Sequence, residues 1–243
     1  GIVGFPAGGI LIVAALAAVV WSAAYGYTLE KVAYKPLRGA PRLSPLISAI
    51  GMSIFLQNYV LLAQTSDYVP FPRLLPEMEF LDYLGNIMGP SDFLILVTST
   101  LAMVSLSLFI RYTRMGKAMR ATAQNRKMAL LLGINADRII SLTFIVGSAL
   151  AALGGVLIAS HMGQVNFGIG FLAGLKAFTA AVLGGIGSIP GAMVGGLVLG
   201  IAESMTTGYL SGNYEDALAF ALLILILIFR PDGILGKAKV QKV

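Results

Sequence analysis

Long stretches without any charged side chain constrain this sequence most, because several of them are long enough to cross a lipid bilayer. They are residues 7–29, 43–66, 93–110, 139–160, 177–202 and 217–229. A helix needs about 20 predominantly apolar residues to span the hydrocarbon core. Several such runs within 243 residues leave no room for a large soluble domain. We therefore expect an all-α integral membrane protein, a polytopic helical bundle that forms a single transmembrane domain over residues 1–243.

Charged residues gather in islands between these runs, and the sign of the charge alternates from one island to the next. Residues 28–43, residues 111–138 and the tail from residue 230 hold every basic residue except Arg73 and Lys176. Residues 64–92 are acidic instead. The positive-inside rule places the basic islands in the cytoplasm. The net charge of +6 then reflects topology, and we expect no nucleic acid partner.

The stretch 161–216 must contain an even number of crossings if the basic tail is to lie in the cytoplasm. We predict a hairpin that runs inward from about residue 171, turns at residues 187–191 and runs outward to about residue 208. A re-entrant pair of half-helices is the alternative, since irregular backbone is tolerated at membrane depth where protein buries it. About seven membrane segments result, with the amino terminus outside. Since the sequence starts without Met or a signal peptide, we expect further segments upstream.

Small residues recur four positions apart in the second half, for example at Gly191 and Gly195 and at Gly196 and Gly200. Four residues make about one helical turn, so each pair offers a smooth patch to a neighbouring helix. These patches indicate close packing of the fold, or surfaces that slide past one another in a conformational change.

Motifs for covalent or nucleotide chemistry are missing from the sequence. The Gly-Lys pairs at residues 116–117 and 236–237 are each followed by Ala, so neither forms a phosphate-binding loop. The chain has no cysteine and one histidine, His161. We expect no catalytic residue, no bound metal and no cofactor in this chain.

Residues 111–138 are basic and rich in helix formers, and Gly133 is placed as a helix stop. A positively charged loop resting on anionic lipid is one interpretation. The length and the defined stop favour a cytoplasmic helix, centred on residues 116–133, that docks a soluble partner.

Four blocks of the sequence resemble the permease family of ATP-driven branched-chain amino acid importers, and within it the subunit type of high-affinity Leu/Ile/Val uptake. The blocks are GKAMRATAQNRKMALLLGINADRIISLTF at 116–144, AYKPLRGAPRLSPLISAIGMSIFLQN at 33–58, GLKAFTAAVLGGIGSIPGAMVGGLVLG at 174–200 and FRPDGILGK at 229–237. The family's amino-terminal segments are absent, which agrees with a chain that continues upstream.

The resemblance implies a bacterial inner-membrane complex of two different permease subunits, two ATPase subunits and a periplasmic substrate-binding protein. ATP and Mg would be bound by the ATPase subunits alone. In the family, the block within residues 111–138 engages the ATPase, which implies a set of coupling residues in this chain: Gly116, Lys117, Arg120, Ala121, Gln124, Asn125, Ala129, Leu132 and Gly133.

Five polar residues in or beside apolar runs are candidates for the transport pathway: Gln57, Asn58, His161, Lys176 and Glu203. Lys176 and Glu203 flank the uncharged run 177–202 at similar distances from the predicted turn. We expect the two to approach each other, because each would lower the desolvation cost of the other. The alternative is that both point to water on separate faces.

Two other functions remain open at this point. An importer for urea or short amides would share the family. A self-sufficient secondary transporter or channel would normally carry charged residues in the membrane, and Lys176 is the one candidate for that role.

Overall fold

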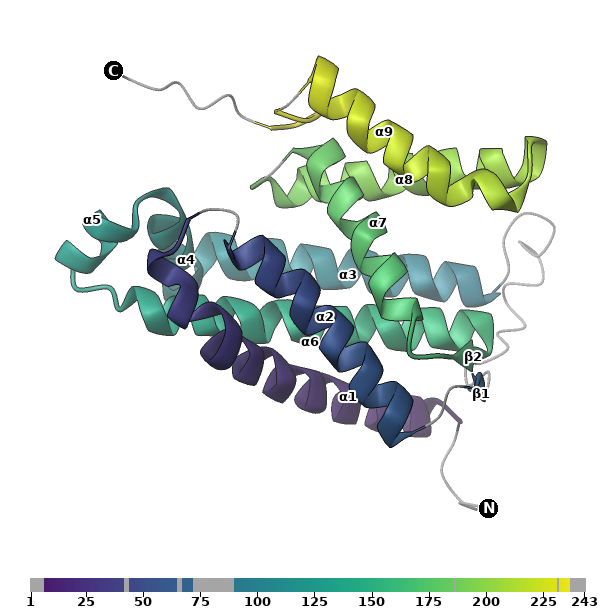
Figure 1. Cartoon of the computed structure of the whole chain (residues 1–243), viewed down its shortest axis with the longest axis horizontal. Coiled ribbons are helices and arrows are strands. Elements are labelled where there is room, and N and C mark those ends of the chain that lie inside the picture. Colours follow the sequence, from purple (N-terminus) through teal and green to yellow (C-terminus); the bar gives the residue numbers. More distant parts are fainter. Residues whose placement is uncertain are drawn as a thin grey trace. The chain divides into compact units, whose positions relative to one another are not determined.

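The computed structural model describes residues 7–41, 44–64, 67–71, 90–185, 187–230 and 232–236, and they are almost entirely helical (Figure 1). The chain divides into two compact units, residues 1–167 and residues 168–243. The prediction of one permease domain stays a prediction.

The described residues of unit 1 form four long helices and two short ones. The long helices are α1 (Ala7–Leu29), α2 (Ser44–Ala63), α3 (Pro90–Tyr112) and α6 (Ala136–Met162). The short helices are α4 (Arg114–Gln124) and α5 (Arg126–Leu131). After α1 the chain continues through a π-helical turn, Glu30–Tyr34, and a 3-10 turn, Pro36–Gly39.

Helices α1 and α6 form the most extensive helix contact within unit 1. Gly26 allows this approach, because a Cβ at this position would collide with the side chain of Ser148. The Ser22 hydroxyl donates a hydrogen bond of 2.9 Å to the Ser148 carbonyl. Near the end of the contact, the rings of Tyr34 and Phe144 have centroids 4.8 Å apart. Small and hydroxyl side chains thus hold the two backbones together, as is usual between membrane helices.

The long helices of unit 1 alternate in direction, which gathers the basic islands at one end. The π-helical and 3-10 turns contact α2, and α4 contacts both α3 and α6. At the other end, β1 (Val69–Pro70) pairs antiparallel with β2 (Gln164–Val165), just after Gly163 ends α6 with a φ of 69°. Residues 28–41 and 111–138 therefore lie opposite residues 67–71, as the charge pattern predicted.

Unit 2 is built on the predicted helical hairpin. Helix α7 (Ile169–Gly184) and helix α8 (Ile189–Tyr209) are joined by a turn in which Gly185 has a φ of 110° and Gly187 a φ of 92°. The 3-10 turn Gly212–Tyr214 then leads into α9 (Glu215–Phe229). The predicted hairpin is present, but its turn lies between Gly184 and Ile189 and not at residues 187–191. That it crosses the membrane twice, and is not a re-entrant pair, stays a prediction.

The hairpin closes through glycine, as the spacing of small residues suggested. A Cβ at Gly191 would collide with the Gly184 backbone, and one at Gly195 would collide with the Ala180 backbone. Beyond α9, the Ile234 and Leu235 amides donate to the Leu183 and Gly184 carbonyls at 2.9 and 3.0 Å. The segment after α9 therefore packs on the turn of the hairpin.

Five helical segments among the described residues are long and apolar enough to cross a membrane. They are Ile12–Tyr34, Asp92–Tyr112, Ala136–Met162, Ile189–Tyr209 and Gly212–Phe229. Ile47–Ala63 and Ile169–Gly184 are shorter apolar helices. The prediction of an all-α membrane protein is confirmed, whereas the count of about seven crossings stays a prediction. Helix α7, with 16 residues, is about 24 Å long and so falls short of the usual bilayer core.

Candidate functional site

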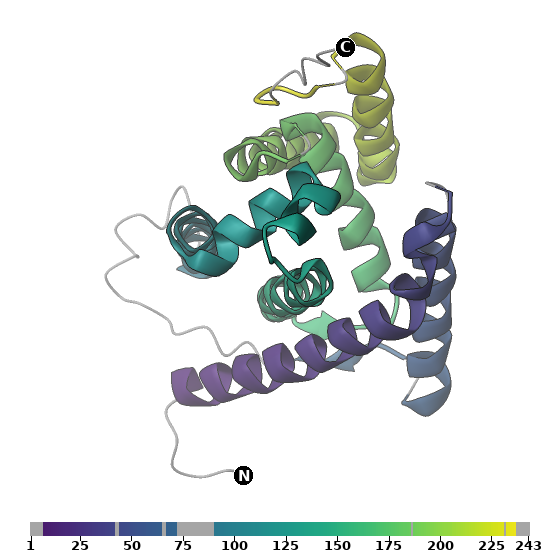
Figure 2. The ribbon, with the colours of Figure 1, turned by 90° about the vertical axis from the view of Figure 1, so that its left-hand side faces the viewer.

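The predicted coupling region folds as two short helices at the end of unit 1 where α3 ends and α6 begins (Figure 2). The sequence suggested one helix centred on residues 116–133, and that expectation is corrected here. Asn125 has an extended backbone, with φ −154° and ψ 104°, and separates α4 from α5. Its side chain accepts a hydrogen bond of 3.1 Å from the Met128 amide. An asparagine that caps the second helix is favoured over one that continues the first.

Gly116 fixes the position of α4 against the end of α3. The Thr113 hydroxyl accepts from the Gly116 amide at 3.0 Å and donates to the Phe109 carbonyl at 2.6 Å. Gly116 is buried, and a Cβ there would collide with the Ile110 backbone. The tight turn between the two helices therefore requires glycine at position 116.

Helix α4 is amphipathic, with Gly116 and Thr122 buried and a polar face exposed. The exposed side chains include Lys117, Arg120 and Gln124, whereas Ala121 is half-buried. Arg120 donates to the Arg111 carbonyl at 3.3 Å, so its guanidinium stays close to the end of α3.

Helix α5 combines a buried anchor with an exposed apolar surface. Ala129 is buried, whereas Leu131 and Leu132 are among the most exposed leucines of the described residues. Gly133 ends the helix with a φ of 78°, and the Ile134 amide donates back to the Ala129 carbonyl at 3.0 Å. Gly116 and Ala129 are buried against their own chain, so neither is placed to contact a partner directly.

A chain of alternating charges connects the coupling region to the end of α1. Glu30 is fully buried; one carboxylate oxygen pairs with Arg38 and the other accepts from the Ser141 hydroxyl at 2.6 Å. Arg38 also pairs with Asp137, which accepts from Arg126 at 2.9 Å. Sequence reasoning missed this network, although all four charged residues lie in the two basic islands.

At one end of the charge network, the backbone forms a π-helical turn. Glu30 begins the π-helical turn that follows α1. A π-helical turn inside a helix is rare and often marks a functional position. Arg126 begins α5, and Asp137 lies in the first turn of α6. A shift of α5 would therefore move the end of α1 as well, because charged side chains connect the two.

The candidate pathway residues of unit 1 are not brought together. Gln57 is half-buried on α2, while Asn58 is exposed and donates to the Ile54 carbonyl at 2.8 Å. His161 lies near the end of α6, and its Nδ1 is 3.2 Å from a carboxylate oxygen of Asp92 on α3. Both side chains of that pair are about half exposed.

The candidate pathway residues of unit 2 meet in one cluster. The Lys176 amine lies 3.4 Å from Oε1 of Glu203 and 3.3 Å from Asp216, and it pairs with Glu215. Oε1 of Glu203 is buried and accepts no hydrogen bond from the described residues. The sequence predicted the first pair and gave no sign that the start of α9 would join it.

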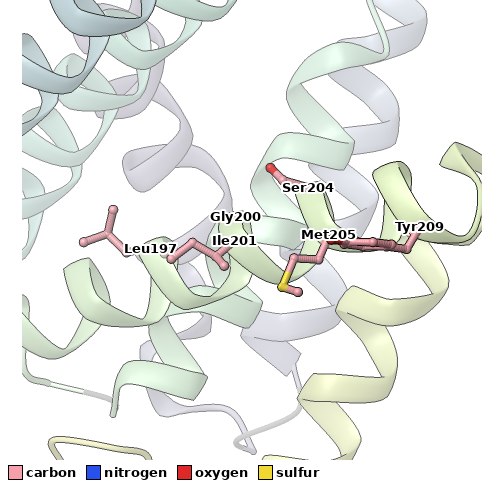
Figure 3. A pocket seen from close by; sticks show the side chains of 7 residues that line it. Leu197, Gly200, Ile201, Ser204, Met205 and Tyr209 are labelled. Carbon is pink, nitrogen blue, oxygen red and sulfur yellow. The ribbon is translucent and has the colours of Figure 1, made fainter. Parts of the chain in front are cut away.

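An apolar groove of about 480 Å³ runs along one face of α8 (Figure 3). Its lining residues share that face: Gly196, Leu197, Gly200, Ile201, Ser204, Met205 and Tyr209. Gly200 opens the groove, since no described atom lies within 4 Å of the position of a Cβ there. The spacing of Gly196 and Gly200 was visible in the sequence, but not that both residues line a groove.

The chain matches known transport proteins over nearly its full length. The family described as branched-chain amino acid transport system / permease component matches residues 7–227. The high-affinity branched-chain amino acid transport system permease protein LivH of Escherichia coli strain K12 is 54% identical over 240 residues, which cover 97% of this chain and 78% of the relative. The corresponding protein BraD of Pseudomonas aeruginosa is 53% identical over 237 residues, 96% of this chain and 77% of the relative.

A more distant relative is named for a different substrate. The autoinducer 2 import system permease protein LsrC of Yersinia enterocolitica is 33% identical over 140 residues, 55% of this chain and 38% of the relative. No solved structure matches the chain. The family match and the high identity to LivH and BraD agree with the helical membrane architecture. The chain therefore belongs to the family of permease components of branched-chain amino acid transport systems.

Proposed function

We propose that this chain forms half of the transmembrane pathway of an ATP-driven importer that moves leucine, isoleucine and valine into the bacterial cytoplasm. Its partners are a second, different permease subunit, two ATPase subunits and a periplasmic substrate-binding protein. ATP and Mg act on the ATPase subunits, and this chain carries out no covalent step. The protein resides in the inner membrane with its carboxyl terminus in the cytoplasm.

The α4–α5 pair is the observation that carries this proposal. It lies at the end of unit 1 where the basic islands gather, which is the cytoplasmic end by the positive-inside rule. A cytoplasmic loop needs neither two capped helices nor exposed leucines. An exposed apolar patch beside charged residues is typical of a docking surface. We assign this surface to the ATPase subunit.

The charge network provides the route by which docking can bias the membrane helices. ATP binding to a partner must favour one of two arrangements of the permease. Arg126 and Asp137 move with α5 and α6, and Arg38 connects them to the buried Glu30. A rigid-body shift at the docking surface would thus displace the end of α1, which Glu30 follows.

The groove on α8 suits the proposed substrates. Its lining is aliphatic apart from Ser204, Tyr209 and a methionine sulfur. An aliphatic side chain of leucine or valine gains by burial there, at about 25 cal/mol for each Å² of apolar surface. Urea and short amides have little apolar surface to bury, so the groove favours branched-chain substrates over them.

Reconstitution of the full-length permease with its partners in proteoliposomes tests the proposal. We expect leucine uptake that requires ATP and the binding protein, with urea and acetamide transported at background rates. Rapid leucine uptake by the permease alone would instead identify a secondary transporter. Uptake of amides in preference to leucine would assign a different substrate class.

The docking surface can be tested by comparing substitutions of two leucines whose side chains are almost equally exposed. Leu132, after α5, is 75% exposed, and Leu210, after α8, is 74% exposed. We expect Leu132→Glu to abolish co-purification of the ATPase subunit and Leu210→Glu to leave it intact. Equal co-purification with both variants would place the docking surface elsewhere.

A further inference from the structure

We propose that a pocket at the basic end of unit 1 binds the phosphate headgroup of an anionic phospholipid. The pocket has a volume of about 340 Å³ and lies between the end of α1, the turns that follow it and the start of α6. It is basic at one end and apolar at the other. The residues that decide its chemistry are three cations, Lys31, Lys35 and Arg138, and three aromatic or aliphatic residues, Tyr27, Leu142 and Ile145.

The carboxylates in the pocket are already neutralised, which leaves its charge positive. Glu30 and Asp137 both line it, but each pairs with Arg38, and Asp137 pairs with Arg126 as well. Within the described ranges, the side chains of Lys35 and Arg138 form no ion pair and are exposed. These two cations are free to bind an anion.

Lys31 adds a third cation to the same end of the pocket. Its amine lies 4.6 Å from the centre of the Tyr27 ring, a cation–π contact that leaves the charge uncompensated by any carboxylate among the described residues. Three cations around one opening suit a phosphate diester, whose oxygens can accept from lysine and arginine together.

The apolar end of the pocket distinguishes a lipid from a free phosphate ion or an acidic protein segment. Arg138, Leu142 and Ile145 are spaced four and three residues apart and share one face of α6. Ile145 lies nine residues along α6 from Ala136, which is about 14 Å. Helix α6 is one of the segments long enough to cross the membrane. A soluble partner does not reach that depth, whereas the glycerol and acyl chains of a lipid do.

Basic pockets between membrane helices on the cytoplasmic side are known binding places for anionic headgroups. Each basic residue near the headgroup is expected to strengthen binding about fivefold. Removal of Lys35 and Arg138 together should therefore weaken binding by a factor on the order of ten or more. The inference goes beyond the proposed function, because it requires only that α1 and α6 lie in a membrane.

The full-length chain, purified in detergent, provides the test by native mass spectrometry with added lipid. The probes are phosphatidylglycerol and phosphatidylcholine with identical acyl chains. The double variant Lys35→Gln/Arg138→Gln is compared with Arg114→Gln/Lys127→Gln, which removes the same residue types from exposed positions of α4 and α5 outside the pocket. We expect the wild type and the second variant to retain phosphatidylglycerol over phosphatidylcholine, and the first variant to lose this preference at least tenfold.

If the double variant does not fold, two further measurements test the lipid site. Ile145→Trp fills the apolar end without a change of charge, and we expect it to lower phosphatidylglycerol retention. Millimolar inorganic phosphate should leave the bound lipid in place. Equal losses in both double variants would show diffuse attraction and overturn the site. Full displacement by inorganic phosphate would overturn the lipid as its ligand.

Discussion

Lys176 on α7 and Glu203 on α8 face each other across the helical hairpin, with Nζ and Oε1 3.4 Å apart. The approach predicted from their positions on either side of the turn is confirmed. Glu215 and Asp216, at the start of α9, bring the cluster to one cation and three carboxylates. Lys176 thus connects α7, α8 and α9, which gives it a structural role whether or not it contacts substrate.

Replacement of Lys176 by methionine should destabilise the protein. Three carboxylates would remain together without a cation, and Glu203 is only 16% exposed. Loss of one partner from a fully buried pair costs about 3–5 kcal/mol, and the partial exposure here reduces the expected cost to about 2 kcal/mol. The midpoint of thermal unfolding in detergent measures the change. Lys176→Arg, which keeps the charge, is the control and should stay close to wild type.

A double-mutant cycle separates electrostatics from packing at the same position. Glu203→Gln should be less harmful in the Lys176→Met background than in the wild type, because it removes a carboxylate that has lost its cation. Exchange of the two residues is a poorer test, since it would put a carboxylate at position 176, where the cation now contacts Glu215 and Asp216. Identical effects of Glu203→Gln in both backgrounds would contradict a functional ion pair.

Arg38→Met should be among the most destabilising changes in unit 1. Glu30 would then lie fully buried with no cation among the described residues, of which Ser141 alone would hydrogen-bond its carboxylate. The expected cost is about 3–5 kcal/mol. Glu30→Gln in the Arg38→Met background should restore part of the thermal stability. Arg114→Met, at an exposed position of α4, serves as the control and should have little effect. No recovery in the double variant would show that the charge network does not carry this stability.

Turns and helix ends that depend on one or two neighbouring residues could be predicted from the sequence. The turn of the hairpin follows from glycines 185 and 187, whose positive φ angles few other residues adopt, and from Ser188, which caps α8. Gly133 was recognised as a helix stop for the same reason. The break at Asn125 was missed, because good helix formers on both sides outweighed the capping preference of a single residue.

Contacts between distant parts of the chain could not be read from the sequence. Arg38 and Asp137 are 99 residues apart, and Glu30 and Ser141 are 111 apart. Charges inside a basic island are usually solvated, so nothing in the pattern distinguished Glu30 from its neighbours. Likewise, Gly191 and Gly196 have similar surroundings in the sequence, yet Gly191 packs on α7 and Gly196 lines the groove. Only the rotation of α8 in the fold separates them.

Gly116→Ala should impair the coupling of ATP hydrolysis to transport. The new Cβ would collide with the Ile110 backbone, which forces α4 away from the end of α3. We expect a loss of leucine-stimulated ATPase activity of at least tenfold in the reconstituted complex, with membrane insertion unchanged. Gly147→Ala on α6 is the control, because no described atom lies within 4 Å of its added Cβ. Normal stimulation in Gly116→Ala would show that the tight α3–α4 turn is not needed for coupling.

Gly200→Leu should block transport while the fold is retained. A Cβ at Gly200 would have no described atom within 4 Å, so the backbone of the hairpin does not need to shift to accept a side chain there. The leucine would project into the groove on α8, between Leu197 and Ser204, and would occupy space that we assign to the aliphatic side chain of the substrate. Gly195→Leu provides the contrast, because its Cβ would collide with the Ala180 backbone and should lower thermal stability instead. Leucine uptake and the unfolding temperature are measured on both variants. We expect Gly200→Leu to lower uptake at least tenfold at an unchanged unfolding temperature. We expect Gly195→Leu to unfold at a lower temperature than the wild type. Wild-type uptake by Gly200→Leu would exclude this face of α8 from the pathway.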